Sequence, residues 1–172
     1  MELLDIYDKD HRLTGRTTVR GERRERGEYV LGVVVWIVNS RGELLITLRS
    51  PEKESWPNYW ENTGGAVMAG ESSVDGCVRE LLEETGIKAD ASELKLLDIE
   101  KGRDTFFDMY ALKRDIELDE LQLQPGETSD AMWVTVERFE EMCRDGSVAE
   151  PIARHYYNMK DKLMSYIKVC MV

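Results

Sequence analysis

Residues 65–87 read GAVMAGESSVDGCVRELLEETGI, and the second half of this stretch has the pattern of an amphipathic helix. Ser72, with Asp75 three residues later, is typical of a capped helix start, and Gly86 supplies a stop. One apolar face is shared by Val74, Cys77, Val78 and Leu81. The stretch therefore predicts a helix over residues 72–85 that packs on a core, with Cys77 as a core residue.

Three glutamates of this helix share another face. Glu80, Glu83 and Glu84 stand at positions i, i+3 and i+4, so their carboxylates come within reach of one ion. Without a partner, each close pair costs about 0.2–0.5 kcal/mol of helix stability, and only Arg79 is nearby in sequence to offset this. Mg²⁺ suits such a site because it prefers oxygen ligands, and Mn²⁺ would substitute. The plain alternative is a solvated acidic helix face.

Strand-like segments lie on both sides of this helix. A hairpin is expected from residues 2–7 and 13–19, followed by an exposed charged connection over 20–28, and a buried hairpin from 29–38 and 43–48. An aromatic-anchored loop over 51–62 leads to the glycines before the helix. Further strands are expected at 94–100, 105–112 and 131–136 with a loop over 122–130, and further helices at 138–144 and 150–170.

The order of these segments predicts an α/β fold, a mixed sheet with helices on both faces. The last helix is marked by apolar residues at three- and four-residue intervals, namely Ile152, Tyr156, Met159, Leu163 and Ile167. No repeat or linker divides the sequence, so residues 1–172 are expected to form one domain with residues 1–28 as an N-terminal extension.

Composition narrows the classes of partner. A net charge of -11 repels a polynucleotide, and a small phosphorylated substrate would need cations to mediate its contact. No apolar run approaches the roughly 20 residues of a membrane span. The first residues, MELLD, have neither a basic nor an apolar signal region, which predicts a cytoplasmic protein. Cys77, Cys143 and Cys170 have no metal-site spacing and are interpreted as ordinary thiols.

The segment over 65–87 resembles the signature of the Nudix hydrolase family. The family pattern runs Gly, five residues, Glu, seven residues, then Arg-Glu-aliphatic-any-Glu-Glu-any-Gly-aliphatic. This sequence matches it at Gly65, Glu71, Arg79, Glu80, Leu81, Glu83, Glu84, Gly86 and Ile87. At roughly 7% usage per residue type, the seven fixed positions would match by chance about once in 10⁸ windows. The resemblance implies the α/β/α sandwich of that family and hydrolysis of a diphosphate linkage.

The resemblance also implies roles for residues of this Nudix box. The three helix glutamates are implied as metal ligands, with the backbone carbonyl of Gly65 as a contributor. Arg79 is implied to orient a carboxylate such as Glu71 rather than to touch substrate, and Gly86 is structural. A bound metal ion would withdraw charge from the phosphoryl oxygens, lower the pKa of water and align it for in-line attack.

The general base has two candidate sources. Glu83 or Glu84 would serve from inside the box, and Glu127, in the loop Gln-Pro-Gly-Glu-Thr over 124–128, is an outside candidate because some family members place a base on such a loop. The box is favoured over Glu127, whose alternative reading is a solvated turn residue.

Two further residues are candidates for substrate binding. Arg49, at the end of an expected core strand, would hold a phosphate, with a surface ion pair as the equal alternative. Trp60 would stack on a base, although burial as a loop anchor is favoured. His11 and His155 have no carboxylate or Cys partner at a spacing typical of a catalytic or metal site, so no role is assigned to them.

The stretches LLDIYDKDHRLTG, VWIVNSRGELLITLRS and WPNYWENTGG further resemble the Nudix subgroup related to isopentenyl diphosphate isomerase. Such isomerases use a Cys near the position of Gly64 or Gly65, and here both are Gly. We therefore expect a hydrolase acting on a nucleoside diphosphate linked to another moiety. An isomerase and a Nudix-fold binding module without turnover are the alternatives, and the oligomeric state, including a homodimer, is left open.

Overall fold

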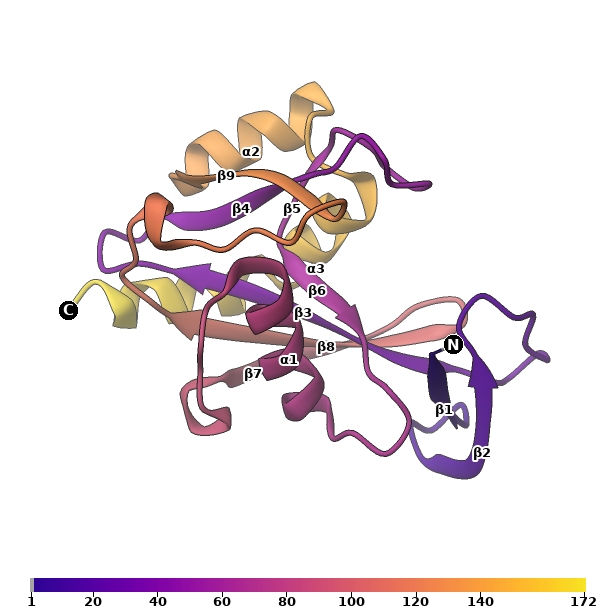
Figure 1. The fold of residues 1–172 in the computed structure, drawn as a ribbon. Coiled ribbons are helices and arrows are strands. Elements are labelled where there is room, and N and C mark those ends of the chain that lie inside the picture. Colours follow the sequence, from indigo (N-terminus) through magenta and orange to yellow (C-terminus); the bar gives the residue numbers. More distant parts are fainter. Residues whose placement is uncertain (1) are drawn as a thin grey trace.

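The computed structural model describes residues 2–172 and contains a mixed sheet between helices (Figure 1). Its main sheet has seven strands in the order β5-β4-β3-β8-β7, with β6 paired to β3 and β9 paired to β4. The strands are β1 (Leu3–Tyr7), β2 (Leu13–Val19), β3 (Val30–Val38), β4 (Leu44–Arg49), β5 (Trp60–Glu61), β6 (Thr63–Ala66), β7 (Lys95–Lys101), β8 (Thr105–Lys113) and β9 (Thr128–Val134). The helices are α1 (Ser73–Thr85), α2 (Val136–Asp145) and α3 (Glu150–Cys170), with short 3-10 helices at Ala91–Glu93 and Leu118–Glu120.

Strand β3 is buried on both faces and separates two hydrophobic cores. Alternate side chains of a strand point to opposite faces, so Val33, Val35 and Ile37 pack with Cys77 and Leu81 of α1. The other face carries Val34, Trp36 and Val38, which pack with apolar residues of α2 and α3. In Figure 1, α1 lies in front of the sheet and α3 behind it. The predicted sandwich and the core position of Cys77 are confirmed.

The hairpin of β3 and β4 differs from the simple central hairpin expected from sequence. The two strands pair only at Ile37–Leu45 and Val38–Leu44 and then diverge. Strand β6 takes the place beside β3, and β4 continues between β5 and β9. The expected loop over 51–62 therefore ends in a strand, and β9 begins at Thr128 rather than at 131, because pairing with β4 extends it.

Helix α1 begins and ends where the sequence predicts. The Ser72 side chain accepts a hydrogen bond from the backbone N–H of Asp75 at 3.2 Å. At the other end Gly86 adopts φ 75°, and its N–H donates to the Leu82 carbonyl. A Cβ built on Gly86 would lie 2.7 Å from the Cβ of Gln122, so this glycine also permits a close approach of the following chain.

Replacing Gly86 by Ala is therefore expected to destabilise the fold for two reasons. The left-handed backbone costs an L-residue about 1–2 kcal/mol, and the contact with Gln122 adds to this. Gly146 is the matched control, because it caps α2 at φ 79° with no atom within 4 Å of a built Cβ. Denaturant unfolding should show a larger loss of unfolding free energy for Gly86→Ala than for Gly146→Ala; equal losses would contradict the role of the close approach.

The N-terminal strands β1 and β2 form the predicted hairpin as a separate two-stranded sheet. Tyr7 and Tyr29 exchange backbone hydrogen bonds of 2.8 and 2.9 Å, which join the hairpin to the start of β3. The Ala69 N–H donates to the Leu3 carbonyl, and the Gly70 N–H donates to Asp5. These contacts fix the hairpin against the loop that precedes α1. None of the helices within residues 2–172 has the length and apolar character to cross a membrane.

Candidate active site

A pocket of about 490 Å³ lies where α1, β6, the N-terminal hairpin and the loops at 52–55 and 124–127 meet. We call it the acidic pocket. Its lining contains seven glutamates, Glu2, Glu52, Glu54, Glu80, Glu83, Glu84 and Glu127. The basic residues of the lining are Arg20, Arg49, Lys53 and Arg79. With seven acidic and four basic side chains, the pocket favours cations over a free phosphate anion.

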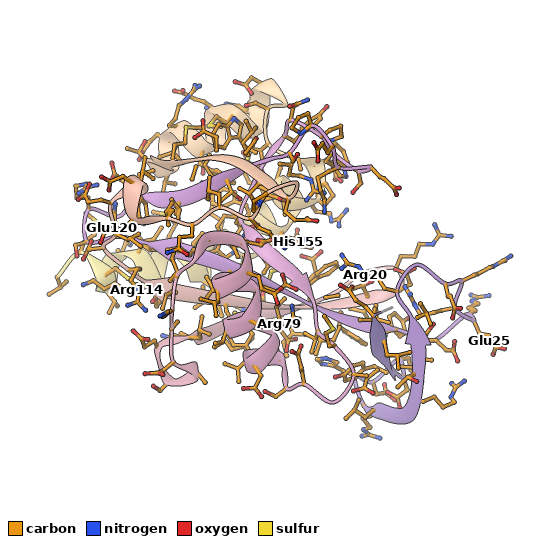
Figure 2. All side chains as sticks on the ribbon, viewed as in Figure 1. Arg20, Glu25, Arg79, Arg114, Glu120 and His155 are labelled. Atoms are coloured by element: carbon orange, nitrogen blue, oxygen red, sulfur yellow. The ribbon has the colours of Figure 1, made fainter. Side chains whose placement is uncertain are left out.

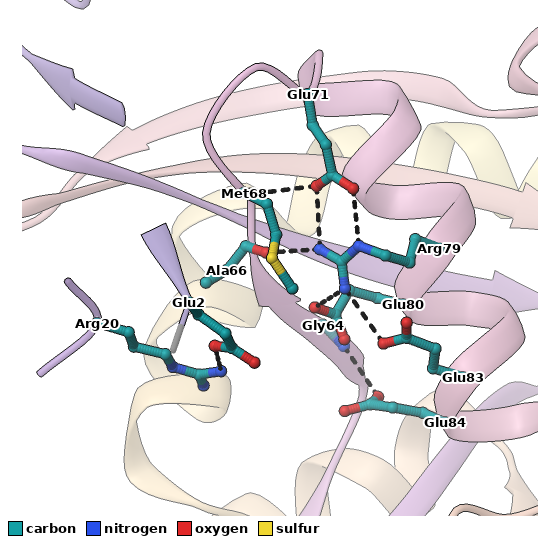
Figure 3. A network of polar contacts seen from close by, with 10 residues as sticks. All are labelled: Glu2, Arg20, Gly64, Ala66, Met68, Glu71, Arg79, Glu80, Glu83 and Glu84. Atoms are coloured by element: carbon teal, nitrogen blue, oxygen red, sulfur yellow. Dashed lines mark hydrogen bonds and ion pairs between the residues drawn. The ribbon is translucent and has the colours of Figure 1, made fainter. Parts of the chain in front are cut away.

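Arg79 is held by carboxylates on two sides (Figure 3). Its Nε and Nη2 donate to the two oxygens of Glu71 at 2.8 and 3.1 Å, and Nη2 also donates to the Ala66 carbonyl at 2.9 Å. Its Nη1 donates to Glu80 at 2.8 Å and to Glu83 at 3.2 Å. Glu71 in turn accepts from the Met68 N–H. The guanidinium therefore joins the loop before α1 to the acidic face of the helix and has few donors left for a substrate.

Glu84 lacks such a partner. It accepts one hydrogen bond, from the Gly64 N–H at 3.3 Å, and within residues 2–172 no basic side chain forms a salt bridge with it. Burial, and then the charges of Glu61 and Glu80, raise the pKa of Glu84 well above its ordinary value. Burial likewise raises the pKa of Glu80 although Arg79 acts against it. Glu84, a half-buried carboxylate without a salt-bridge partner beside two further carboxylates, is the kind of ligand that a hard divalent cation prefers.

The side chains do not stand in a finished coordination cage. Among residues 2–172, no three acidic, His or Cys side chains are gathered closely enough to hold a metal ion. Glu80 and Glu83 are both paired with Arg79, whereas Glu84 is not. Gly65 lies directly against Glu80, since a Cβ on Gly65 would be 2.2 Å from the Glu80 carboxylate.

Both sources of a general base reach this pocket. Glu83 lines it from α1, and its side chain is 47% exposed. Glu127 lines it from the loop before β9, and one of its carboxylate oxygens is paired with the Lys53 ammonium. The structure thus brings together the two candidates that are 44 positions apart in sequence. Their roles stay predictions.

Arg49 and Trp60, the predicted substrate contacts, are placed differently from each other. Arg49 lines the acidic pocket, but its Nη1 donates to both oxygens of Glu61 at 2.9 and 2.8 Å. This ion pair is mostly enclosed rather than on the surface, since the Arg49 and Glu61 side chains are 16% and 15% exposed, and a phosphate-binding role for Arg49 stays a prediction. Trp60 lies in β5, packs against the α3-side core and is absent from the lining of the pocket. The ring of Trp60 thus lies where the anchor interpretation places it, and its role in substrate binding stays a prediction.

Several residues at the site were missed from sequence. Glu2 and Arg20 enter the pocket from the N-terminal hairpin and are paired at 2.7 Å (Figure 3), and Figure 2 labels Arg20 near this hairpin. Lys53 lines the pocket and Glu61 pairs with Arg49 beside it, and both belong to a stretch that was expected to be an aromatic loop. The charged segment over 20–28 indicated an exposed connection. Only the docking of the hairpin shows that Arg20 of this segment faces the acidic pocket.

Comparison with known proteins shows the family to which this chain belongs. The NUDIX domain model matches residues 28–156, which is most of the chain and includes the whole acidic face of α1. This chain belongs to the Nudix family. The match leaves the N-terminal hairpin outside the shared domain, although Glu2 and Arg20 at the ends of this hairpin line the acidic pocket.

Individual relatives agree. An uncharacterized Nudix hydrolase of Listeria monocytogenes is 37% identical over 147 residues, covering 85% of this chain and 87% of the relative. The crystal structure of DR0079 from Deinococcus radiodurans, 27% identical, superposes with a TM-score of 0.75 over 90% of this chain and 99% of that one. These findings confirm the predicted Nudix fold and a hydrolase acting on pyrophosphate bonds. Nudix hydrolases generally use divalent metal ions.

The resemblance to the isomerase subgroup is narrower. The isopentenyl-diphosphate Delta-isomerase of Escherichia coli is 37% identical over 59 residues, which is 34% of this chain and 32% of that enzyme. A match of this length supports common descent within the Nudix family and leaves the reaction to be decided by the site.

Proposed function

We propose that this Nudix protein is a metal-dependent pyrophosphohydrolase that cleaves the diphosphate linkage of a nucleoside diphosphate joined to another moiety. The observation that carries the proposal is Glu84, a half-buried carboxylate of the Nudix box that lines an acidic pocket and has no cationic partner among the described residues. A divalent cation at this position would compensate that charge and would also attract the phosphates of a substrate.

In this proposal the three helix glutamates Glu80, Glu83 and Glu84 hold Mg²⁺, with Mn²⁺ as a substitute, and the Gly65 backbone carbonyl contributes. When bound, the ion supplies charge withdrawal from the phosphoryl oxygens and activation of the attacking water. Arg79 and Glu71 position the helix carboxylates through the contacts described above. A glutamate of the box is the favoured base, with Glu127 as the alternative.

The isomerase alternative lacks its acid. Gly64 and Gly65 occupy the position where a proton-donating Cys is expected. Among residues 2–172 no cysteine lines the acidic pocket. Cys77 lies on the other face of α1, fully buried, and burial raises the pKa of its thiol to about 12. A thiol in that position cannot deliver a proton to a substrate in the pocket.

Activity assays separate these functions. With Mg²⁺ present, the protein is expected to release phosphate products from at least one member of a panel of nucleotide sugars, dinucleotides, nucleoside triphosphates and coenzyme A. With isopentenyl diphosphate it is expected to give no dimethylallyl diphosphate, measured by chromatography. Isomerisation at an enzymatic rate would overturn the proposal. If the protein cleaves none of the compounds of the panel, the binding module without turnover is favoured.

The remaining expectations are part of the same proposal. The 172 residues act as one Nudix domain in the cytoplasm, with the last helix, α3, closing the core. The partner is a small phosphorylated substrate rather than a polynucleotide, because the net charge of -11 and the acidic pocket both repel a phosphate backbone. A homodimer is compatible with this function and is tested by light scattering.

A further inference from the structure

The four basic side chains of the acidic pocket are not equally available to a substrate. Arg79 donates to three carboxylates and to a backbone carbonyl. Arg49 donates to both oxygens of Glu61, and Lys53 is paired with a carboxylate of the loop before β9. The side chains of Arg79, Arg49 and Lys53 are only 20%, 16% and 23% exposed. A phosphate would therefore reach these three cations only by breaking partly enclosed ion pairs.

Arg20 differs from the other three. Its side chain is 58% exposed, and within residues 2–172 the guanidinium forms one hydrogen bond, from Nη1 to Glu2 at 2.7 Å. The Glu2 side chain is itself 41% exposed. A guanidinium carries five N–H groups in a planar fork, so most donors of Arg20 are unused. An exposed ion pair of this kind contributes about 0–1 kcal/mol, so Glu2 is a partner that another anion can replace.

The N-terminal hairpin fixes Arg20 at the acidic pocket. Arg20 directly follows β2, and its backbone N–H donates to the Glu2 carbonyl at 2.9 Å, which joins the two ends of the hairpin. In Figure 3 the Glu2–Arg20 pair and the glutamates of α1 lie on opposite sides of the view. The hydrogen bond to Glu2 raises the pKa of Arg20, and burial acts against it. The charges of Glu80 on α1 and Glu127 before β9 raise this pKa further, so Arg20 lies within electrostatic reach of both.

A diphosphate group is a better partner for Arg20 than Glu2 is. Phosphoryl oxygens that do not bind the metal ion need other donors, and two of them match the fork of a guanidinium with parallel hydrogen bonds. Glu2 engages only one nitrogen of Arg20. Exchange of Glu2 for a phosphoryl group therefore gains a hydrogen bond and breaks only an exposed ion pair.

We propose that Arg20 binds the diphosphate group of the substrate and that Glu2 is the carboxylate that Arg20 releases when the substrate enters. The inference rests on the proposed function. It assigns a substrate contact to the N-terminal hairpin, which lies outside residues 28–156, the part of the chain that matches the NUDIX domain model. Glu2 holds the guanidinium in place in the free protein and competes with the substrate for it.

Binding of a diphosphate analogue that cannot be hydrolysed tests this contact without turnover. The probe is methylenediphosphonate in the presence of Mg²⁺, and its binding is measured by calorimetry. Arg20→Met should weaken binding by about 10-fold or more, because charge-assisted hydrogen bonds are lost. Arg16→Met is the matched control, since Arg16 is a hairpin arginine that is 60% exposed, is paired with Glu28 and does not line the acidic pocket. Arg16→Met should bind the analogue as the wild-type protein does.

Glu2→Gln should have the opposite effect. Removal of the Glu2 charge releases the guanidinium, so the analogue should bind more tightly, by about 3-fold or more. Glu54→Gln removes the same charge from the pocket lining, and Glu54 forms no ion pair with Arg20. Its effect should be smaller. In a protein that already carries Arg20→Met, Glu2→Gln should change binding no more than Glu54→Gln does.

Unfolding temperatures check that the variants are folded. Arg20→Met and Arg16→Met each remove one ion pair with an exposed arginine, so both should unfold within a few degrees of the wild-type protein. If Arg20→Met does not fold, the comparison of Glu2→Gln with Glu54→Gln still decides the inference, because both substitutions leave Arg20 in place.

The outcomes separate the two proposals. Cleavage of a panel compound, together with equal binding of the analogue by the wild type and Arg20→Met, would overturn the inference and leave the proposed function intact. Binding of the analogue that depends on Arg20, without cleavage of any panel compound, would support the contact and overturn the proposed function. An equal gain in binding for Glu54→Gln and Glu2→Gln would show that pocket charge alone sets the affinity, which would overturn the role of Glu2.

Discussion

Replacing Glu84 by Gln is expected to lower kcat on the order of 10³-fold or more at a Mg²⁺ concentration that saturates the wild-type protein. The substitution keeps the size of the side chain and its contact with the Gly64 N–H, but removes the charge that has no partner in the pocket. Chelator should abolish wild-type activity, and Mg²⁺ or Mn²⁺ should restore it. Near-wild-type turnover of Glu84→Gln would show that Glu84 is not a metal ligand.

Thermal unfolding gives an independent measure of the same charge. Because the folded state raises the pKa of Glu84, the fold favours the neutral form. Stability contributed by that form is present below the ordinary glutamate pKa and is lost as the pH rises through the folded value. In chelator at pH 8, Glu84→Gln should therefore unfold at the same temperature as the wild type or higher. Added Mg²⁺ should raise the unfolding temperature of the wild type more than that of the variant.

Glu54→Gln is the matched control for both measurements. Glu54 lines the same pocket, is exposed, and has no hydrogen bond or salt bridge to other residues within 2–172. Its replacement lowers the negative charge of the pocket by the same amount as Glu84→Gln but leaves the three helix glutamates unchanged. We expect little change in kcat or in the response to Mg²⁺. A loss as large as that of Glu84→Gln would show that total pocket charge, rather than one ligand, controls activity.

The helix α1 could be predicted closely from sequence because its signals are local. Ser72, Asp75 and Gly86 act within a few residues of the helix ends, and the apolar spacing of its core face is read along one segment. The strands were harder. Strand β6 replaces β4 beside β3, and this exchange depends on pairing between residues about 30 positions apart, which no single segment encodes.

The same distinction holds at the site. The box glutamates lie on one helix face, so their common position in the lining of the acidic pocket could be predicted from helical spacing alone. Arg20 comes from the N-terminal hairpin and Glu61 from β5, and what they face is decided by docking of the hairpin and by the pairing of β5 with β4. Trp60 shows the reverse case, since an aromatic ring close to the site in sequence is directed into the core by the same register.

Identification of the general base is the remaining large-effect prediction, and the structure supplies two comparable residues. Glu83 and Glu127 both line the acidic pocket and are about equally exposed, at 47% and 41% of their side chains. Glu83 is paired with Arg79 and Glu127 with Lys53. Exposure and ion pairing therefore do not distinguish them, and kinetics must do so.

We expect Glu83→Gln to cause the large loss and Glu127→Gln a small one. Removal of a metal ligand slows turnover and also raises the Mg²⁺ concentration needed for half-maximal activity, because the site loses part of its cation anchor. Removal of a base that touches no metal lowers kcat by about 10²–10⁴ without that second effect, and it erases the acidic limb of the pH–rate profile. Activity titrated with Mg²⁺ across pH 5–9 separates these two patterns.

Lys53→Met provides the control, because it frees the Glu127 carboxylate while leaving Glu83 and Arg79 in place. If Glu83 is both ligand and base, Lys53→Met should leave the acidic limb where it is in the wild type. A shift of that limb in Lys53→Met, together with a Glu127→Gln protein that binds Mg²⁺ and substrate normally yet scarcely turns over, would assign the base to Glu127. The proton of the attacking water would then pass to the loop before β9 rather than to α1.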